Sequence, residues 1–388
     1  MRKCVRCLTP ETVDTITFDE AGVCSVCRQI EFKKDKIDWE QRGRALQELI
    51  AEYQGKGLYD CIVPYSGGKD SVFQLYYIIK VLKLKPLVVR FNHWGYRPLV
   101  EENNTSVFKQ LGCDVVEFTP NWHVVRETML EAFKRRGDFC WHCHTGIYAG
   151  VMQMAVRFEV PLLFWGESTA EYHSWYTFEE MEEVDEKRFN RLMNQGITAD
   201  DMYEFLQGRV ERRDLWMFDY PKRKDLIRLK VRSICLGNYI EWDTKANVEL
   251  IKRELGWKGQ QVEGVPPEYD YEKIECKFQG MRDYSKFVKR GYGRANHLLS
   301  IDIRNGRKTR EEAAELEYQY DGKRPASMDW FLENLKMTEQ EYYDTLKPQE
   351  VHPWQFDPTQ VEPGPVLPDF DKWDRTDVSD VPLGPEKR

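Results

Sequence analysis

The chain has 388 residues, of which 41% are hydrophobic and 31% are charged, and this length predicts a main domain with smaller attached pieces. Its formal net charge of −8 disfavours a protein that grips a long nucleic acid, because many phosphate contacts need an excess of basic residues. No apolar run is long enough to cross a membrane, and the N-terminus lacks an apolar stretch of the secretory type. We therefore expect a globular protein of the cytoplasm.

The N-terminal segment carries two Cys-x-x-Cys pairs, Cys4 with Cys7 and Cys24 with Cys27. The sixteen residues between the pairs fall within the spacing of four-cysteine zinc sites. Four thiolates complete a tetrahedron around zinc and leave no open position, so such a metal is structural rather than catalytic. We predict a small zinc-binding ribbon here.

The most specific motif lies between a predicted strand over residues 58–65 and a predicted helix over residues 72–82. There the chain reads SGGKDS over residues 66–71, a segment that we call the phosphate turn. Glycines let the main chain approach a phosphate, and the helix start presents N–H groups and a positive dipole end to it. Lys69 adds a point charge, and Asp70 in the first helical turn could help to hold Mg²⁺.

The phosphate turn is not a Walker A motif, which requires four residues between its first glycine and the Gly-Lys pair. It resembles the signature of the PP-loop ATP pyrophosphatases, which cleave ATP to AMP and pyrophosphate. The resemblance implies ATP and Mg²⁺ as cofactors, with Lys69, Asp70 and Ser71 as the catalytic candidates. The candidates for holding the pyrophosphate end of ATP are Ser66, Gly67, Gly68, Lys69, Asp70 and Ser71.

Further along the chain, predicted strands alternate with predicted helices. The strands cover residues 86–91, 114–118 and 161–165, and the helices cover residues 39–53, 99–111, 122–134 and 145–158. This alternation predicts an α/β fold, in which helices cover both faces of a parallel sheet. Ligands bind at the carboxyl ends of such strands, so Phe91, Asn92, Gly166 and Glu167 are candidates for lining the nucleotide site.

A second set of cysteines combines Cys140 and Cys143, again a Cys-x-x-Cys pair, with the distant Cys235. This set resembles the three-thiolate iron–sulfur site of the tRNA-thiolating PP-loop enzymes, in which a [4Fe-4S] cluster keeps one iron open. Because His142 and His144 lie beside the pair, a second zinc ion is an alternative. A third interpretation is a pair of inert buried thiols with Cys235 unrelated to them. The cysteines at positions 61, 113 and 276 are most simply core residues.

Several segments outside the phosphate turn carry a closer resemblance. They are the two N-terminal cysteine pairs and residues 140–146, 237–243, 276–280, 291–295 and 321–325. These segments are similar to those of the N-acetyl sugar amidotransferases of bacterial surface-polysaccharide and flagellin sugar pathways. The resemblance implies that an acetamido group on a nucleotide-linked sugar becomes an acetamidino group, with AMP and pyrophosphate released. It also implies that a HisH-like glutaminase and a HisF-like subunit supply the ammonia, since nothing in the chain resembles a glutaminase.

The predicted order of parts is as follows. Residues 1–35 form the zinc ribbon, 36–260 the PP-loop domain with a helical insert at about 169–230, 261–347 a helical region, and 348–388 an extended Pro/Asp-rich tail. The basic and aromatic residues over 285–297 have three interpretations: they bind the nucleotide-sugar, they line a surface for a partner protein, or they form an ordinary solvated face of a helix.

Two other functions stay open: a tRNA sulfurtransferase that uses an iron–sulfur cluster, and a non-catalytic zinc-bearing scaffold subunit. The acidic net charge counts against the first, because binding tRNA means contacting many phosphates. The intact Lys69 and Asp70 count against the second, because a scaffold has no need of a charged phosphate turn.

Overall fold

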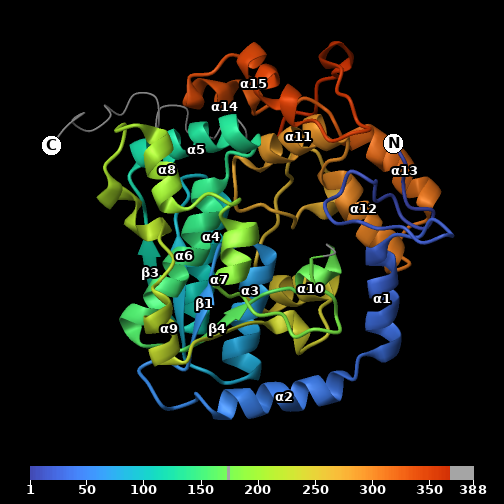
Figure 1. The fold of residues 1–388 in the computed structure, drawn as a ribbon. Coiled ribbons are helices and arrows are strands. Elements are labelled where there is room, and N and C mark those ends of the chain that lie inside the picture. The colour runs from blue at the N-terminus through green and yellow to red at the C-terminus, as the bar shows by residue number, and fades with distance from the viewer. Residues whose placement is uncertain (173–174, 368–388) are drawn as a thin grey trace.

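The computed structural model describes residues 1–172 and 175–367, and its centre is a five-stranded parallel sheet (Figure 1). The strand order is β3-β2-β1-β4-β5, so the chain starts in the middle of the sheet and crosses over to build each half. The strands are β1 (Cys61–Pro64), β2 (Pro86–Phe91), β3 (Asp114–Phe118), β4 (Leu162–Trp165) and β5 (Arg232–Cys235). The predicted α/β fold with a parallel sheet is confirmed.

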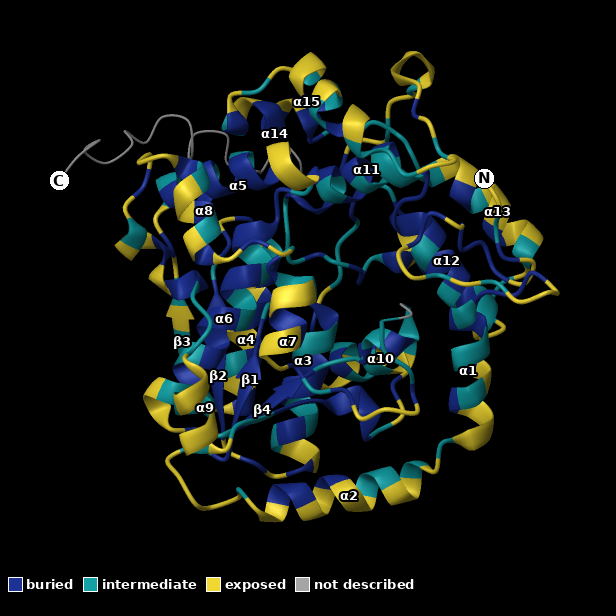
Figure 2. Cartoon of the chain, viewed as in Figure 1, coloured by how far each residue is buried: buried dark blue, intermediate teal, exposed yellow. Residues whose placement is uncertain are grey.

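Helices cover both faces of the sheet, because alternate residues of each strand point to opposite sides. Cys61 and Val63 pack into one core with α2 (Trp39–Ala51), α3 (Lys69–Tyr76), α4 (Pro98–Leu111) and α10 (Thr244–Leu255). On the other face, Ile62 packs with α6 (Trp141–Phe158), and α5 (Trp122–Arg136) lies beside α6. Helix α3 continues into a π-helical turn over Tyr77–Val81. Every residue of β1, β2 and β4 is buried, as Figure 2 shows for the centre of the molecule.

Strand β5 is the one strand of this sheet that the sequence did not predict. It lies at one edge of the sheet beside β4, and Ser233 also accepts a main-chain hydrogen bond from Val184 of the insert. Only four residues long and beginning with a half-exposed arginine, it carries no alternating or continuous apolar pattern. Its place in the sheet follows from tertiary pairing.

The segment between β4 and β5 forms short helices that pack beside α5 and α6. Its elements are Thr169–Glu171, α7 (Glu186–Arg188), Phe189–Met193, α8 (Ala199–Leu206), Arg212–Phe218 and α9 (Arg223–Leu229). Leu206 and Phe218 of this segment share a buried cluster with Trp141 of α6. The insert therefore adds its own small core to one side of the sheet domain.

The C-terminal region is helical and packs across α5 and α6. It contains α11 (Gln279–Arg290), α12 (Arg294–Arg304), α13 (Arg310–Tyr320), α14 (Met328–Leu335) and α15 (Glu339–Leu346), with short turns at Pro267–Tyr269, Lys347–Gln349 and Pro358–Gln360; a further turn, Leu236–Asn238, directly follows β5. Phe133 of α5, Phe139 and Phe331 form one buried cluster. The indole N–H of Trp354 donates to the carbonyl of Val288 at 3.0 Å, so the beginning of the predicted tail docks on α11. The last part of that tail, residues 368–388, lies outside the described residues.

The N-terminal segment returns to this C-terminal region rather than standing apart. The main-chain N–H of Leu8 donates to Ser300 at 3.2 Å, and Lys3 pairs with Glu317 at 2.7 Å. Figure 1 shows the N-terminal chain beside α12 and α13, with α1 (Ser25–Lys36) leading away to α2. Within the described ranges, no helix is long and apolar enough to cross a membrane.

Candidate active site and metal centre

The phosphate turn joins β1 to α3 and is shaped by its own residues. Gly67 has φ +86°, and a Cβ there would come within 2.3 Å of the Asn104 side-chain oxygen. The hydroxyl of Ser71 accepts the N–H of Gly67 at 3.1 Å and donates to the carbonyl of Gly68 at 3.0 Å. Gly68 is the N-cap of α3, so the first-turn N–H groups of this helix have no capping side chain there. The turn thus has the backbone form that favours an anion.

Lys69 is 7% exposed, and its ammonium group is 2.7 Å from Asp70 and 2.8 Å from Glu272. Burial alone lowers the pKa of Lys69, but the charges of Asp70, Glu272 and Glu167 outweigh burial and raise the pKa well above its ordinary value. The lysine is therefore a permanent cation. Its counter-charges come from three separate parts of the chain.

Two carboxylates beside the phosphate turn, those of Glu272 and Glu275, come from the C-terminal region. Burial raises the pKa of Glu272, but Lys69 and Arg294 reverse that effect and hold it at about 2. Glu275 lies against the turn, since a Cβ on Gly68 would come within 2.6 Å of its carboxylate oxygen. Burial and the charge of Asp70 raise the pKa of Glu167 to about 7. The turn therefore combines a fixed cation with carboxylates that could take up a divalent cation such as Mg²⁺.

A cavity of about 780 Å³ opens above the phosphate turn, within the size range of ligand sites. Among the predicted site residues, it is lined by Ser66, Gly68, Lys69, Asp70, Ser71, Phe91, Gly166 and Glu167. Gly67 and Asn92 are not among the described residues that line it. Gly67 faces α4 instead, and the side-chain oxygen of Asn92 accepts the N–H of Trp94 at 2.9 Å.

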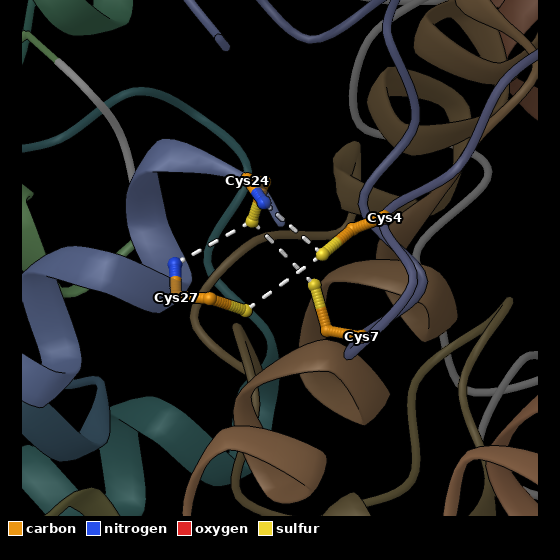
Figure 3. A group of neighbouring side chains, drawn as sticks. All are labelled: Cys4, Cys7, Cys24 and Cys27. Carbon is orange, nitrogen blue, oxygen red and sulfur yellow. Dashed lines mark hydrogen bonds between the residues drawn. The ribbon is translucent and has the colours of Figure 1, made fainter. Parts of the chain in front are cut away.

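The four N-terminal cysteines come together in a compact buried group (Figure 3). The sulfur atoms of Cys4 and Cys27 are 3.9 Å apart, those of Cys7 and Cys24 are 3.8 Å apart, and all four lie within 4.8 Å of one another. The guanidinium of Arg304 lies 3.6 Å from the Cys7 sulfur and offsets thiolate charge. Two Cys-x-x-Cys turns that converge in this way fit a metal such as zinc or an iron–sulfur cluster.

The second predicted cysteine set is not assembled in this way. Cys235 ends β5 as a buried thiol 3.8 Å from the Arg188 guanidinium, whereas Cys140 and Cys143 lie at the start of α6. Across the described residues, the N-terminal cysteines are the one group of ligating side chains within 4.8 Å of one another. Cys235 lines the same cavity as Cys140 and Cys143 but contacts the insert through Arg188, so a shared metal or cluster at these three cysteines stays a prediction.

Cys276, interpreted from the sequence as a core residue, is the cysteine that accompanies Cys140 and Cys143. All three contribute to the same apolar cluster and line the cavity. Burial raises the pKa of Cys143, and the charge of Cys276 adds to that rise. The Cys276 sulfur is 4.0 Å from Nδ1 of His93. No spacing rule links these residues, so only the fold brings them together.

Sequence reasoning also missed the buried ion pairs that connect the C-terminal region to the phosphate turn. Arg294 binds Glu272 at 3.3 Å and Asp283 at 3.1 Å. The carboxylates belong to a loop and to α11, and neither stands in a recognisable motif. The one available signal was the basic content of residues 285–297, which includes Arg294.

Comparisons with known proteins give a family match, a relative and a solved structure. Residues 268–362 match the family model of the LPS biosynthesis protein WbpG-like, C-terminal domain. The uncharacterized protein MJ1599 of Methanocaldococcus jannaschii is 26% identical over 242 residues, which are 62% of this chain and 80% of that protein. The solved structure of U34-tRNA thiolase NcsA from Methanococcus maripaludis with its [4Fe-4S] cluster aligns with a TM-score of 0.32 and 14% identity, over 81% of this chain and 89% of that one. The match over residues 268–362 supports the resemblance that the motifs predict: in this region the chain is similar to the WbpG-like proteins of lipopolysaccharide biosynthesis.

Proposed function

We propose that this protein is an ATP-dependent, AMP-forming N-acetyl sugar amidotransferase of bacterial surface-glycan biosynthesis. One observation carries the proposal: the phosphate turn and the WbpG-like domain line the same cavity. An ATP bound at the turn would therefore have its α-phosphorus near a ligand held by the C-terminal domain. The reaction is expected to take place in the cytoplasm, where ATP is supplied.

The proposed reaction has two steps. The carbonyl oxygen of an acetamido group attacks the α-phosphorus of ATP, the bond to the β-phosphate oxygen breaks, and pyrophosphate leaves. The resulting O-adenylyl imidate is attacked at carbon by ammonia, a proton is lost, and AMP departs with the former carbonyl oxygen. The acetamidino group remains. The carbonyl oxygen cannot leave by itself, but once it is part of AMP it leaves readily.

Residues of the chain would stabilise the charge of the leaving pyrophosphate and accept the proton that ammonia loses. Lys69 and the N–H groups of the turn would stabilise the pyrophosphate as it leaves, and Mg²⁺ held with the help of Asp70 would add countercharge. Glu167, whose pKa is raised to about 7, is our candidate for accepting the proton that ammonia loses. The walls of the cavity would limit the access of water to the imidate.

Ammonia is the remaining reactant. We propose that a HisH-like glutaminase with a HisF-like subunit delivers it, as the family resemblance implies. For the four N-terminal cysteines we propose zinc, since a closed four-thiolate site suits a structural ion. This ion would fasten the N-terminal segment to α12 and α13 and would take no part in the chemistry.

The test is an assay of the purified protein with ATP, Mg²⁺, an ammonium salt and a panel of nucleotide-linked diacetamido sugars. The expected products are AMP, pyrophosphate and a sugar about 1 Da lighter, because an oxygen is replaced by NH. A parallel reaction with tRNA and sulfide should give no thiolated tRNA. Formation of ADP, or thiolation of tRNA without sugar amidination, would refute the proposal.

A further inference from the structure

Several basic residues of the C-terminal region line the cavity, and five of them, on α11 and at the start of α12, fall into two groups. Arg290 pairs with Asp14 at 2.8 Å, and Arg294 is 9% exposed and bound to two carboxylates. These two arginines hold the fold together. The second group consists of Arg282, Lys286 and Lys289, which lie on α11 and line the cavity with incomplete neutralisation.

Lys286 has the weakest ion pair of this group. Its nearest acidic partner is Asp283 at 3.9 Å, and that carboxylate already accepts two hydrogen bonds from Arg294 and one from Gln279. Burial lowers the pKa of Lys286 to about 8, against the attraction of Asp283. The Lys286 side chain is 27% exposed, and it lines the cavity beside the ring of Tyr292. A cation in this setting favours an anionic ligand.

Its two neighbours are also under-neutralised. The closest carboxylate to Arg282 is Asp138 at 3.6 Å, and the Arg282 Nε is buried without a hydrogen-bond partner among the described residues. Lys289 donates to the neutral main-chain carbonyl of Arg136 at 3.1 Å. Asp138 and Asp283 are the carboxylates that pair with these three side chains among the described residues, Asp321 attracts Lys286 from farther away, and Asp283 is also bound by Arg294, so this wall is short of negative charge.

This wall is linked to the phosphate turn by a chain of ion pairs. Lys69 contacts Glu272 at 2.8 Å, Glu272 contacts Arg294 at 3.3 Å, Arg294 contacts Asp283 at 3.1 Å, and Asp283 contacts Lys286 at 3.9 Å. In Figure 1, α11 lies above α3 in the view. One cavity therefore has the phosphate turn at one end and this basic wall at another, and the acidic residues between them would keep two anionic ligands apart.

We infer that Arg282, Lys286 and Lys289 form a second anion subsite, which binds the diphosphate of a nucleoside-diphosphate-linked acceptor while ATP occupies the phosphate turn. Its identification as the acceptor site rests on the proposed function. A diphosphate fits because its several charged oxygens can bind one guanidinium and two ammonium groups together. The sugar would then extend along the cavity toward Lys69.

The experiment is a calorimetric titration of nucleoside diphosphates into the full-length protein. UDP, CDP, GDP and dTDP are titrated separately after the phosphate turn has been saturated with a non-hydrolysable ATP analogue. At least one diphosphate should bind, and its nucleoside should bind at least about tenfold more weakly. Lys286→Gln and Arg282→Gln should each weaken that binding about tenfold, whereas Lys286→Arg should largely restore it. Lys347→Gln, at a side chain that is 64% exposed, is the matched control and should bind as the wild type does.

The inference fails if no diphosphate binds to the analogue-saturated protein, or if the two glutamine variants bind as well as the wild type. Unchanged affinity of the variants for the ATP analogue, with an unchanged melting temperature, would show that the fold and the phosphate turn are intact. If Lys286→Gln does not fold, the comparison of Arg282→Gln with Arg282→Lys decides the question. Intact diphosphate binding without AMP formation would count against the proposed function alone.

Discussion

The ammonium group of Lys69 lies 2.8 Å from a carboxylate oxygen of Glu272. Lys69 is the first residue of α3, whereas Glu272 belongs to the WbpG-like domain. Both side chains are buried, and Arg294 holds Glu272 from its other side at 3.3 Å. The position of the lysine in the phosphate turn therefore depends on the C-terminal domain as well as on the turn itself. A ligand that contacts both the phosphate turn and the C-terminal domain would act on this one ion pair.

Replacing Lys69 with alanine should lower AMP formation at least about 100-fold, because the leaving pyrophosphate loses its fixed cation. Release of AMP and pyrophosphate in the presence of an acetamido sugar is the measurement. Lys80→Ala is the matched control, since Lys80 lies just beyond α3 and is exposed. An active Lys69→Ala enzyme would contradict the role assigned to this lysine.

Glu272→Gln should lower the free energy of unfolding by about 3 kcal/mol at pH 7, because a carboxylate whose pKa falls from 4.5 to about 2 on folding stabilises the folded state. That contribution is complete above pH 4.5 and is lost as the pH falls toward 2. The difference between wild type and variant in urea unfolding should therefore shrink over this acidic window.

Glu268→Gln is the control for this pH dependence. Glu268 pairs with Lys308 at 2.9 Å, but its side chain is 43% exposed, so its loss should cost less than about 1 kcal/mol. An equal effect of the two substitutions, or a Glu272→Gln effect that stays constant down to pH 3, would show that the buried pair does not stabilise the fold as argued.

Gly67→Ala should destroy the phosphate turn. The residue has φ +86°, and the added Cβ would meet Asn104 at 2.3 Å and Val100 at 2.7 Å. We expect a loss of at least about 2 kcal/mol of stability and of measurable ATP binding. Gly43→Ala is the opposite case, because Gly43 lies inside α2 with open space around its Cβ position, and it should gain about 0.5–1 kcal/mol. Titration calorimetry and thermal melting report the two effects.

Cys4→Ala, or treatment with a strong chelator, should release one metal ion per chain and lower the melting temperature by roughly 5 °C. The reason is that the cysteine group fixes the segment that carries Leu8, which packs against Ser300 of α12. Cys113→Ala, at a half-buried cysteine outside the group, should keep the metal. Full metal content in Cys4→Ala would exclude this site as the binding centre.

The features that could be predicted from the sequence are those written in short stretches of chain. The cysteine pairs around position 4 and position 24, the turn over residues 66–71 and the buried runs of β1, β2 and β4 each carry their own signal. Local spacing suffices there, because a Cys-x-x-Cys turn or a glycine with positive φ acts within a few bonds. Strand β5 has no such pattern and depends on pairing with β4.

By itself, the sequence determined the chemistry available at the phosphate turn, the four-cysteine ligand set and the alternation that builds a parallel sheet. Only the tertiary structure decided which distant side chains meet: Glu272 with Lys69, Cys276 with the pair at 140 and 143, and a basic wall on α11. The physical reason is that ion pairs and thiol groups need atoms a few ångströms apart. The chain brings such atoms together only after its helices and strands have packed.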